Sequence, residues 1–208
     1  MPPPAWLEAL ERRAPDVVAC WEMADELRPL RRELRSRVRR LEAMQMLDQQ
    51  EALGDALEEV LRLIPDQLLR APGGEEDWNV AQAFAHATAA RRFLVAWAAL
   101  SAAGEWPDDD APVVRPSIPG RADASREELL VLLDKSRGSL RQSAATIAGH
   151  ELDHCPLEHP LVGRLRCGEW LLFVGVHDLM HLEQLHRLLA TGSGRGDDLM
   201  GWTRSETA

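Results

Sequence analysis

The chain has 208 residues and a mass of 23.2 kDa, which suits one domain with a substantial core, and its formal charge of −10 argues against sequence-independent nucleic-acid binding as the main role. No apolar run approaches the ~20 residues that a membrane-spanning helix needs, and the first residues lack the pattern of a secretory signal. Three irregularly spaced cysteines indicate reduced thiols, so we expect a cytoplasmic protein without membrane association.

The first forty residues are predicted to form an N-terminal helical extension, residues 1–40. Pro29 fits the first turn of a helix. Apolar residues recur every three or four positions, with arginines on the opposite face: Leu27, Leu30, Leu34, Val38 and Leu41. This pattern is typical either of a basic helix that binds nucleic acid or a membrane, or of an added helix that packs on the rest of the protein or on a second subunit. We favour the second interpretation, because charge runs are usually solvated faces.

Helical periodicity predicts four further helices, over residues 41–64, 79–101, 125–148 and 169–191. Pro65 ends the first of them. The second and third begin with capping-box pairs, Asn79 with Gln82 and Ser125 with Glu128. The fourth is expected to end just before Gly192. No strand is predicted.

The connections between these helices favour a four-helix bundle over residues 41–191. A crossover rich in proline and acidic residues joins the second helix to the third, and long crossovers are a known feature of such bundles. Residues 149–164 are expected to be irregular, and residues 192–208 are expected to form a flexible C-terminal tail. The predicted fold class is therefore all-α.

Two histidines on one apolar face suggest a metal site. His177 and His181 share a stripe of the last predicted helix with Trp170, Phe173 and Leu188, so both should point into the core about one turn apart. Two imidazoles at this spacing can reach one ion. His186 should instead face water.

His86 is the predicted third ligand. It lies on an apolar stripe of the second helix with Ala89, Ala90, Phe93 and Trp97. Metal sites in bundles are built from facing helices, and three neutral imidazoles suit zinc, nickel, iron or copper. Three protein ligands leave a coordination position open, as in catalytic rather than structural zinc sites.

A second cluster could also bind a metal: His150, Asp153, His154, Cys155 and His159. The nearby glycine and prolines would break any helix that fixed these side chains, which makes the cluster the weaker hypothesis. No Ser-His-Asp order, phosphate-binding glycine loop or dinucleotide fingerprint is present.

Four other residues near the predicted site have alternative interpretations. His159 could lie at its mouth, or be an ordinary loop histidine, which is the preferred reading. Asp178 could orient a ligand imidazole, although an exposed helix carboxylate is the simpler expectation. Gln184 could hydrogen-bond to metal-bound water or pack between helices. Cys167 is expected to be a small core residue.

Two stretches resemble the DinB/YfiT-like superfamily. WNVAQAFAHATAARR resembles its single-histidine helix, and HPLVGRLRCGEWLLFVGVHDLMHLEQL resembles its C-terminal signature. The resemblance extends over residues 41–191. It implies an antiparallel four-helix bundle with a divalent metal, commonly nickel or zinc, on His86, His177 and His181. Members of known activity include S-transferases that use low-molecular-weight thiols and a maleylpyruvate isomerase branch.

The sequence therefore supports two hypotheses of function. The first is a metal-dependent enzyme, either a transferase that uses a small thiol or a hydrolase, acting on a small-molecule substrate. The alternative is a non-catalytic metal- or ligand-binding bundle with a stress-response or interaction role. A homodimer is expected by analogy with related bundles and from the amphipathic N-terminal helix.

Overall fold

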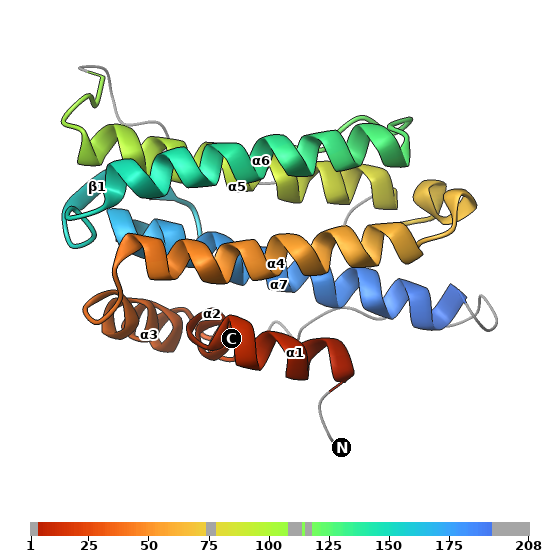
Figure 1. The fold of residues 1–208 in the computed structure, drawn as a ribbon, viewed down its shortest axis with the longest axis horizontal. Helices are drawn as coiled ribbons and strands as arrows, with labels where there is room; N and C mark the ends of the chain where they lie inside the picture. Colours follow the sequence, from red (N-terminus) through yellow and green to blue (C-terminus); the bar gives the residue numbers. More distant parts are fainter. Residues whose placement is uncertain (1–3, 74–77, 108–113, 115–117, 193–208) are drawn as a thin grey trace.

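The computed structural model describes residues 4–73, 78–107, 114 and 118–192. Four long helices form the bundle: α4 (Ala43–Leu63), α5 (Val80–Ala102), α6 (Arg126–Ile147) and α7 (Cys167–Gly192). As Figure 1 shows, their axes run side by side, and both α4 and α5 pack mainly against α6 and α7. The predicted all-α fold is confirmed.

The long crossover between α5 and α6 returns to the end of the bundle where α5 begins. The side chain of Asn79, the N-cap of α5, donates a hydrogen bond to the carbonyl of Ala122, and the Gly120 amide donates to the carbonyl of Gln82. As a result α5 and α6 run in the same direction, whereas α4 and α5, joined by the short 3-10 helix η1 (Asp66–Arg70), run in opposite directions. This return path brings the crossover next to His86.

The helix starts follow the predicted capping chemistry. Asn79 and Ser125 each accept a hydrogen bond from the backbone amide three residues on, and Gln82 and Glu128 bond back to the cap amides. Each box satisfies two of the amides that a helix start leaves unpaired. The last helix begins at Cys167, two residues before the predicted start, and includes Gly192, which the sequence placed just beyond its end.

The prediction that the chain has no strand was wrong. Strands β1 (His154–His159) and β2 (Gly163–Arg166) form an antiparallel hairpin between α6 and α7. Cys155 and Leu157 point inward and are buried. Gly163 has a φ of +66°, a conformation that glycine adopts without strain at such a turn.

The N-terminal helices pack on the bundle. Helices α1 (Ala5–Arg13), α2 (Pro15–Trp21) and α3 (Leu27–Val38) lie along the side formed by α4 and α7 (Figure 1). Pro29 lies in the first turn of α3, as predicted. Residues of α2 and α3 belong to the same hydrophobic core cluster as the bundle helices. Where α2 meets α7 the approach is close, because a Cβ atom on Gly175 would lie 2.8 Å from Val17 Cγ1.

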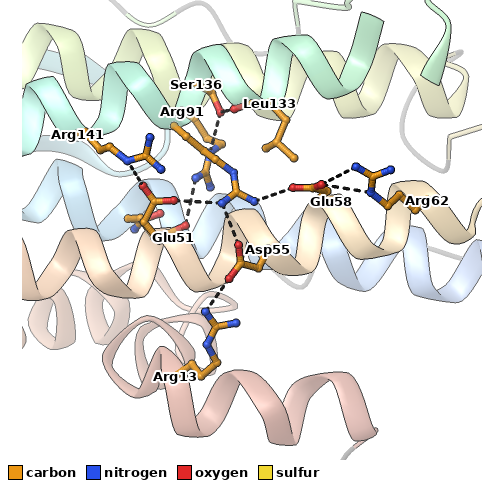
Figure 2. Close-up of polar contacts among 11 residues, drawn as sticks. Arg13, Glu51, Asp55, Glu58, Arg62, Arg91, Leu133, Ser136 and Arg141 are labelled. Carbon is orange, nitrogen blue, oxygen red and sulfur yellow. Dashed lines mark hydrogen bonds and ion pairs between the residues drawn. The ribbon is translucent and has the colours of Figure 1, made fainter. Parts of the chain in front are cut away.

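Ion pairs connect the outer faces of α4 and α6. Arg137 of α6 pairs with three acidic residues of α4, and one of these, Asp55, also pairs with Arg13 of α1 at 2.7 Å (Figure 2). Within the described part of the chain, each helix is either too short or too polar to span a bilayer. The boundaries of the predicted extension and bundle stay predictions, and residues 193–208 of the predicted tail lie outside the described residues.

Candidate metal site

His177 and His181 lie one turn apart on α7 and face each other. Their Nε2 atoms are 3.4 Å apart, and their ring centroids are 4.6 Å apart. Two nitrogens bound to one tetrahedral ion at ~2.0–2.1 Å would be separated by about 3.4 Å. The spacing already present on α7 therefore fits a shared ion.

His86 comes to the same point from α5. Its ring centroid lies 5.2 Å from that of His177 and 5.5 Å from that of His181. One ligand atom from each of the three histidines lies within 4.8 Å of the other two. The structure thus brings together the three residues that the sequence singled out, and this group could hold a metal ion.

Neighbouring groups determine which ring nitrogen of His86 and His181 carries the proton. The Ile118 carbonyl, 3.0 Å from His86 Nδ1, can only accept, so that nitrogen must donate. Gln184 donates its amide to the Gly73 carbonyl, which turns its oxygen toward His181 Nδ1 at 3.0 Å. Both rings therefore carry their hydrogen on Nδ1 and present the Nε2 lone pair to the centre of the group, the form that a metal requires.

Burial keeps the α7 histidines neutral. It lowers the pKa of His181 to about 4, and it lowers the pKa of His177 well below its ordinary value, with smaller contributions from the neighbouring histidines. Nδ1 of His177 is buried and has no hydrogen-bond partner among the described residues. Neutral imidazoles at neutral pH are available as ligands without competition from protons.

The three histidines differ in their exposure. His181 is buried, whereas His86 and His177 are partly exposed. Phe93, which the sequence placed on an inward stripe with His86, is 60% exposed, so that expectation was wrong. Helix α5 is apolar around most of its circumference. Its sequence pattern therefore does not identify which face is buried, and Phe93 lies on the exposed side.

Asp178 is not the exposed carboxylate that the sequence suggested. It is fully buried and forms an ion pair with Arg91 of α5. Arg91 also donates to Ser136 Oγ (Figure 2) and to the Gln50 carbonyl, each at 3.2 Å. Burial raises the pKa of Asp178 to about 6, and the Arg91 guanidinium opposes this rise. The pair joins the two helices that carry His86 and His177. The sequence pattern of α7 alone could not show that Asp178 pairs with Arg91 of α5.

His159 lies at the end of β1, against the aromatic residues that precede His177 on α7. Its ring centroid is 5.6 Å from that of Phe173, and burial lowers its pKa. Its Nδ1 accepts the backbone amides of Leu161 and Val162, so Nε2 carries the hydrogen. His159 is thus a neutral imidazole that can donate a hydrogen bond from Nε2, close to the three histidines of the site.

The alternative cluster around His150 does not assemble. Across the described residues, the His86, His177 and His181 group is the one set of three or more His, Cys, Asp or Glu side chains close enough to share an ion. His150 instead bonds to Asp153 at 2.8 Å, and Cys155 is buried.

The prediction for His186 was wrong, and the prediction for Cys167 is confirmed. His186 was expected to face water, but its ring stacks on that of Trp6 at 4.8 Å, because α1 covers this part of α7. Burial lowers the pKa of His186. Cys167 is fully buried, which confirms its assignment to the core.

Comparison with known proteins gives one match. Residues 49–185 match the model of the DinB superfamily, and this range includes all three histidines. Neither the curated proteins nor the solved structures contain a match to the chain. The match covers most of α4, all of α5 and α6, and α7 as far as Leu185. The chain belongs to the DinB superfamily.

Proposed function

We propose that this protein is a metal-dependent enzyme in which His86, His177 and His181 hold one divalent transition-metal ion. The main support is the tautomer of two histidines. Nδ1 of His86 donates to the Ile118 carbonyl, and Nδ1 of His181 donates to the Gln184 side-chain oxygen, so that the Nε2 lone pairs of both rings are available to one ion. The 3.4 Å separation between the Nε2 atoms of His177 and His181 fits an ion bound by both.

Nickel or zinc is the proposed ion. Imidazole nitrogen suits both, and the described group contains no carboxylate of the kind that magnesium or calcium prefers. Such an ion, when bound, would act as a Lewis acid that lowers the pKa of a coordinated water or thiol.

Partial exposure of the group favours catalysis over a structural role. A structural zinc site usually has four protein ligands, whereas this group offers three, and two of them, His86 and His177, are partly exposed. A low-molecular-weight thiol is the proposed substrate, by analogy with thiol-dependent members of the family, and a transfer reaction is the narrower proposal within the enzyme class.

The open coordination position can be tested with Co²⁺ as a spectroscopic probe. We expect the Co²⁺-loaded protein, titrated with small thiols, to develop a thiolate-to-metal charge-transfer absorption, while His177→Ala should develop none. Bound Co²⁺ whose spectrum is unchanged by every thiol would contradict the thiol proposal. Thiol consumption with a panel of electrophiles would then separate a transferase from a thiol-binding protein.

A further inference from the structure

The exposed face of α3 and the two residues after it carry a row of arginines. These arginines line an open groove of about 700 Å³, which is within the ~300–1,000 Å³ typical of small-molecule sites. The lining residues are six arginines and one serine: Arg28, Arg31, Arg32, Arg35, Ser36, Arg39 and Arg40. We call this surface the arginine groove.

Most arginines of the groove lack an acidic partner among the described residues, unlike Arg137 and Arg141 of α6. The side chains of Arg28, Arg32, Arg39 and Arg40 make no ion pair or hydrogen bond to any residue that the structure describes. By contrast, the bundle arginines that face α4 pair with its carboxylates (Figure 2). Like charges three and four residues apart on a helix repel one another, so this row lacks the compensation found elsewhere.

Two arginines of the groove are held in place by hydrogen bonds to residues of β2 and α7. Arg31 donates to the Arg164 carbonyl at 3.2 Å, and Arg35 bonds to the buried carboxylate of Glu169 at 3.3 Å. Glu169 also accepts the Arg166 amide at 3.0 Å, which helps to fix the position of its carboxylate. One wall of the groove is thereby positioned in advance, which reduces the entropy lost on binding.

We propose that the arginine groove binds a compact anion with several phosphate groups. Guanidinium groups bind phosphate oxygens through paired hydrogen bonds, and a row of them can contact successive phosphates of one ligand. The inference is independent of the metal site.

The charge distribution favours a compact ligand over a nucleic acid. Residues 27–40 contain seven arginines and one glutamate, a formal charge of +6, so the rest of the chain carries −16. The net negative charge of the rest of the chain would repel a long polyanion that extends past the groove, whereas a compact ligand needs to contact only the arginines. The groove also lacks the aromatic side chains on which bases of single strands stack.

A membrane is disfavoured for a separate reason. Interfacial helices insert an apolar face into the lipid. On the apolar face of α3, Leu27 at the helix start is 46% exposed, but Leu30, Leu34 and Val38 are at most 3% exposed and belong to the core shared with the bundle. These three side chains are not available to lipid.

The test uses inorganic triphosphate and the full-length protein in isothermal titration calorimetry. We expect saturable binding of one triphosphate per chain, with affinity rising from phosphate through pyrophosphate to triphosphate and falling as salt is added. The double variant Arg32→Glu/Arg39→Glu should weaken triphosphate binding at least tenfold. Both residues are exposed and without an acidic partner among the described residues, so the fold should be retained, as circular dichroism can verify.

A matched control separates the groove from overall charge. Arg12→Glu/Lys135→Glu changes the net charge equally at exposed sites outside the groove and should alter triphosphate affinity less than threefold. Equal loss in both double variants, or no triphosphate binding by the wild type, would overturn the proposal. So would tight binding of a DNA duplex or of phosphatidylserine vesicles without binding of triphosphate.

Discussion

At the scale of single residues, His86 and His181 of the metal site are held by different parts of the chain. The crossover holds His86 through the Ile118 carbonyl, and Gln184, one turn further along α7, holds His181. The three histidines themselves could be predicted from sequence, because inward imidazoles on helical stripes leave a visible pattern. The Ile118 carbonyl could not, since every residue has one and only the path of the crossover brings it to His86.

The lowered pKa of His181 predicts a specific dependence of stability on pH. In the metal-free folded protein the pKa of His181 is about 4, whereas in the unfolded chain it is near 6.5. As the pH falls between these values, the unfolded state binds more protons and the free energy of unfolding decreases, by about 3 kcal/mol for this residue.

Comparing wild type with His181→Gln in chelator isolates this effect. Asp178 has a raised pKa and acts with the opposite sign over part of the same range, but it is common to both proteins. Urea unfolding from pH 7.5 to 4.5 should show a steeper loss of stability for the wild type. Parallel profiles would contradict the assignment of His181 as a buried neutral imidazole.

The buried pair of Arg91 and Asp178 predicts a large effect of breaking it. Arg91→Met should lower the free energy of unfolding by about 3–5 kcal/mol, because Asp178 would keep a buried charge without a partner. Arg91→Met/Asp178→Leu should recover much of this loss. Arg62→Met, which breaks an exposed pair with Glu58, should cost less than about 1 kcal/mol. If Arg91→Met lowered the free energy of unfolding no more than Arg62→Met does, the account of the buried pair would be refuted.

At the scale of elements, α5 and α7 place the ligands, and the start of α5 matters for both stability and metal binding. Asn79 caps α5 seven residues before His86 and also bonds to the crossover at Ala122. Both capping boxes could be predicted from sequence because they are local. The β1–β2 hairpin could not, since its strands are short, one contains Pro156, and the sheet that the structure describes has just these two strands.

Matched cap variants test the role of the α5 start. Asn79→Ala and Ser125→Ala should each lower the free energy of unfolding by about 1 kcal/mol in chelator. Only Asn79→Ala should also weaken metal binding, measured by competition with a coloured chelator, because α6 supplies no ligand. Equal metal affinity in the two variants would show that the α5 start does not position His86.

At the scale of the whole molecule, the N-terminal helices and the bundle share one core. Leu34 of α3 is fully buried, and Val17 of α2 contacts α7 near Gly175. The amphipathic pattern of α3 was visible in the sequence. Its packing partner was not, because an apolar face does not specify whether it covers the same chain or a second copy.

A shared core predicts one cooperative unfolding transition. Leu34→Ala should destabilise the entire protein by about 2–5 kcal/mol, whereas Leu27→Ala, at a site that is 46% exposed, should have little effect. Denaturant unfolding followed by far-ultraviolet circular dichroism and by tryptophan fluorescence should give coincident curves. A separate early transition in Leu34→Ala, with the main one unchanged, would show that α1–α3 fold independently of the bundle.

The most direct test of the central proposal is the metal content of protein purified without an affinity tag. Elemental analysis should find about one transition-metal ion per chain, as three imidazoles around one centre imply. His86→Ala and His177→Ala should each lose that ion, while His150→Ala should keep it. Wild-type protein that binds no added nickel or zinc, or a His86→Ala/His177→Ala double variant that keeps its metal, would contradict the proposed site.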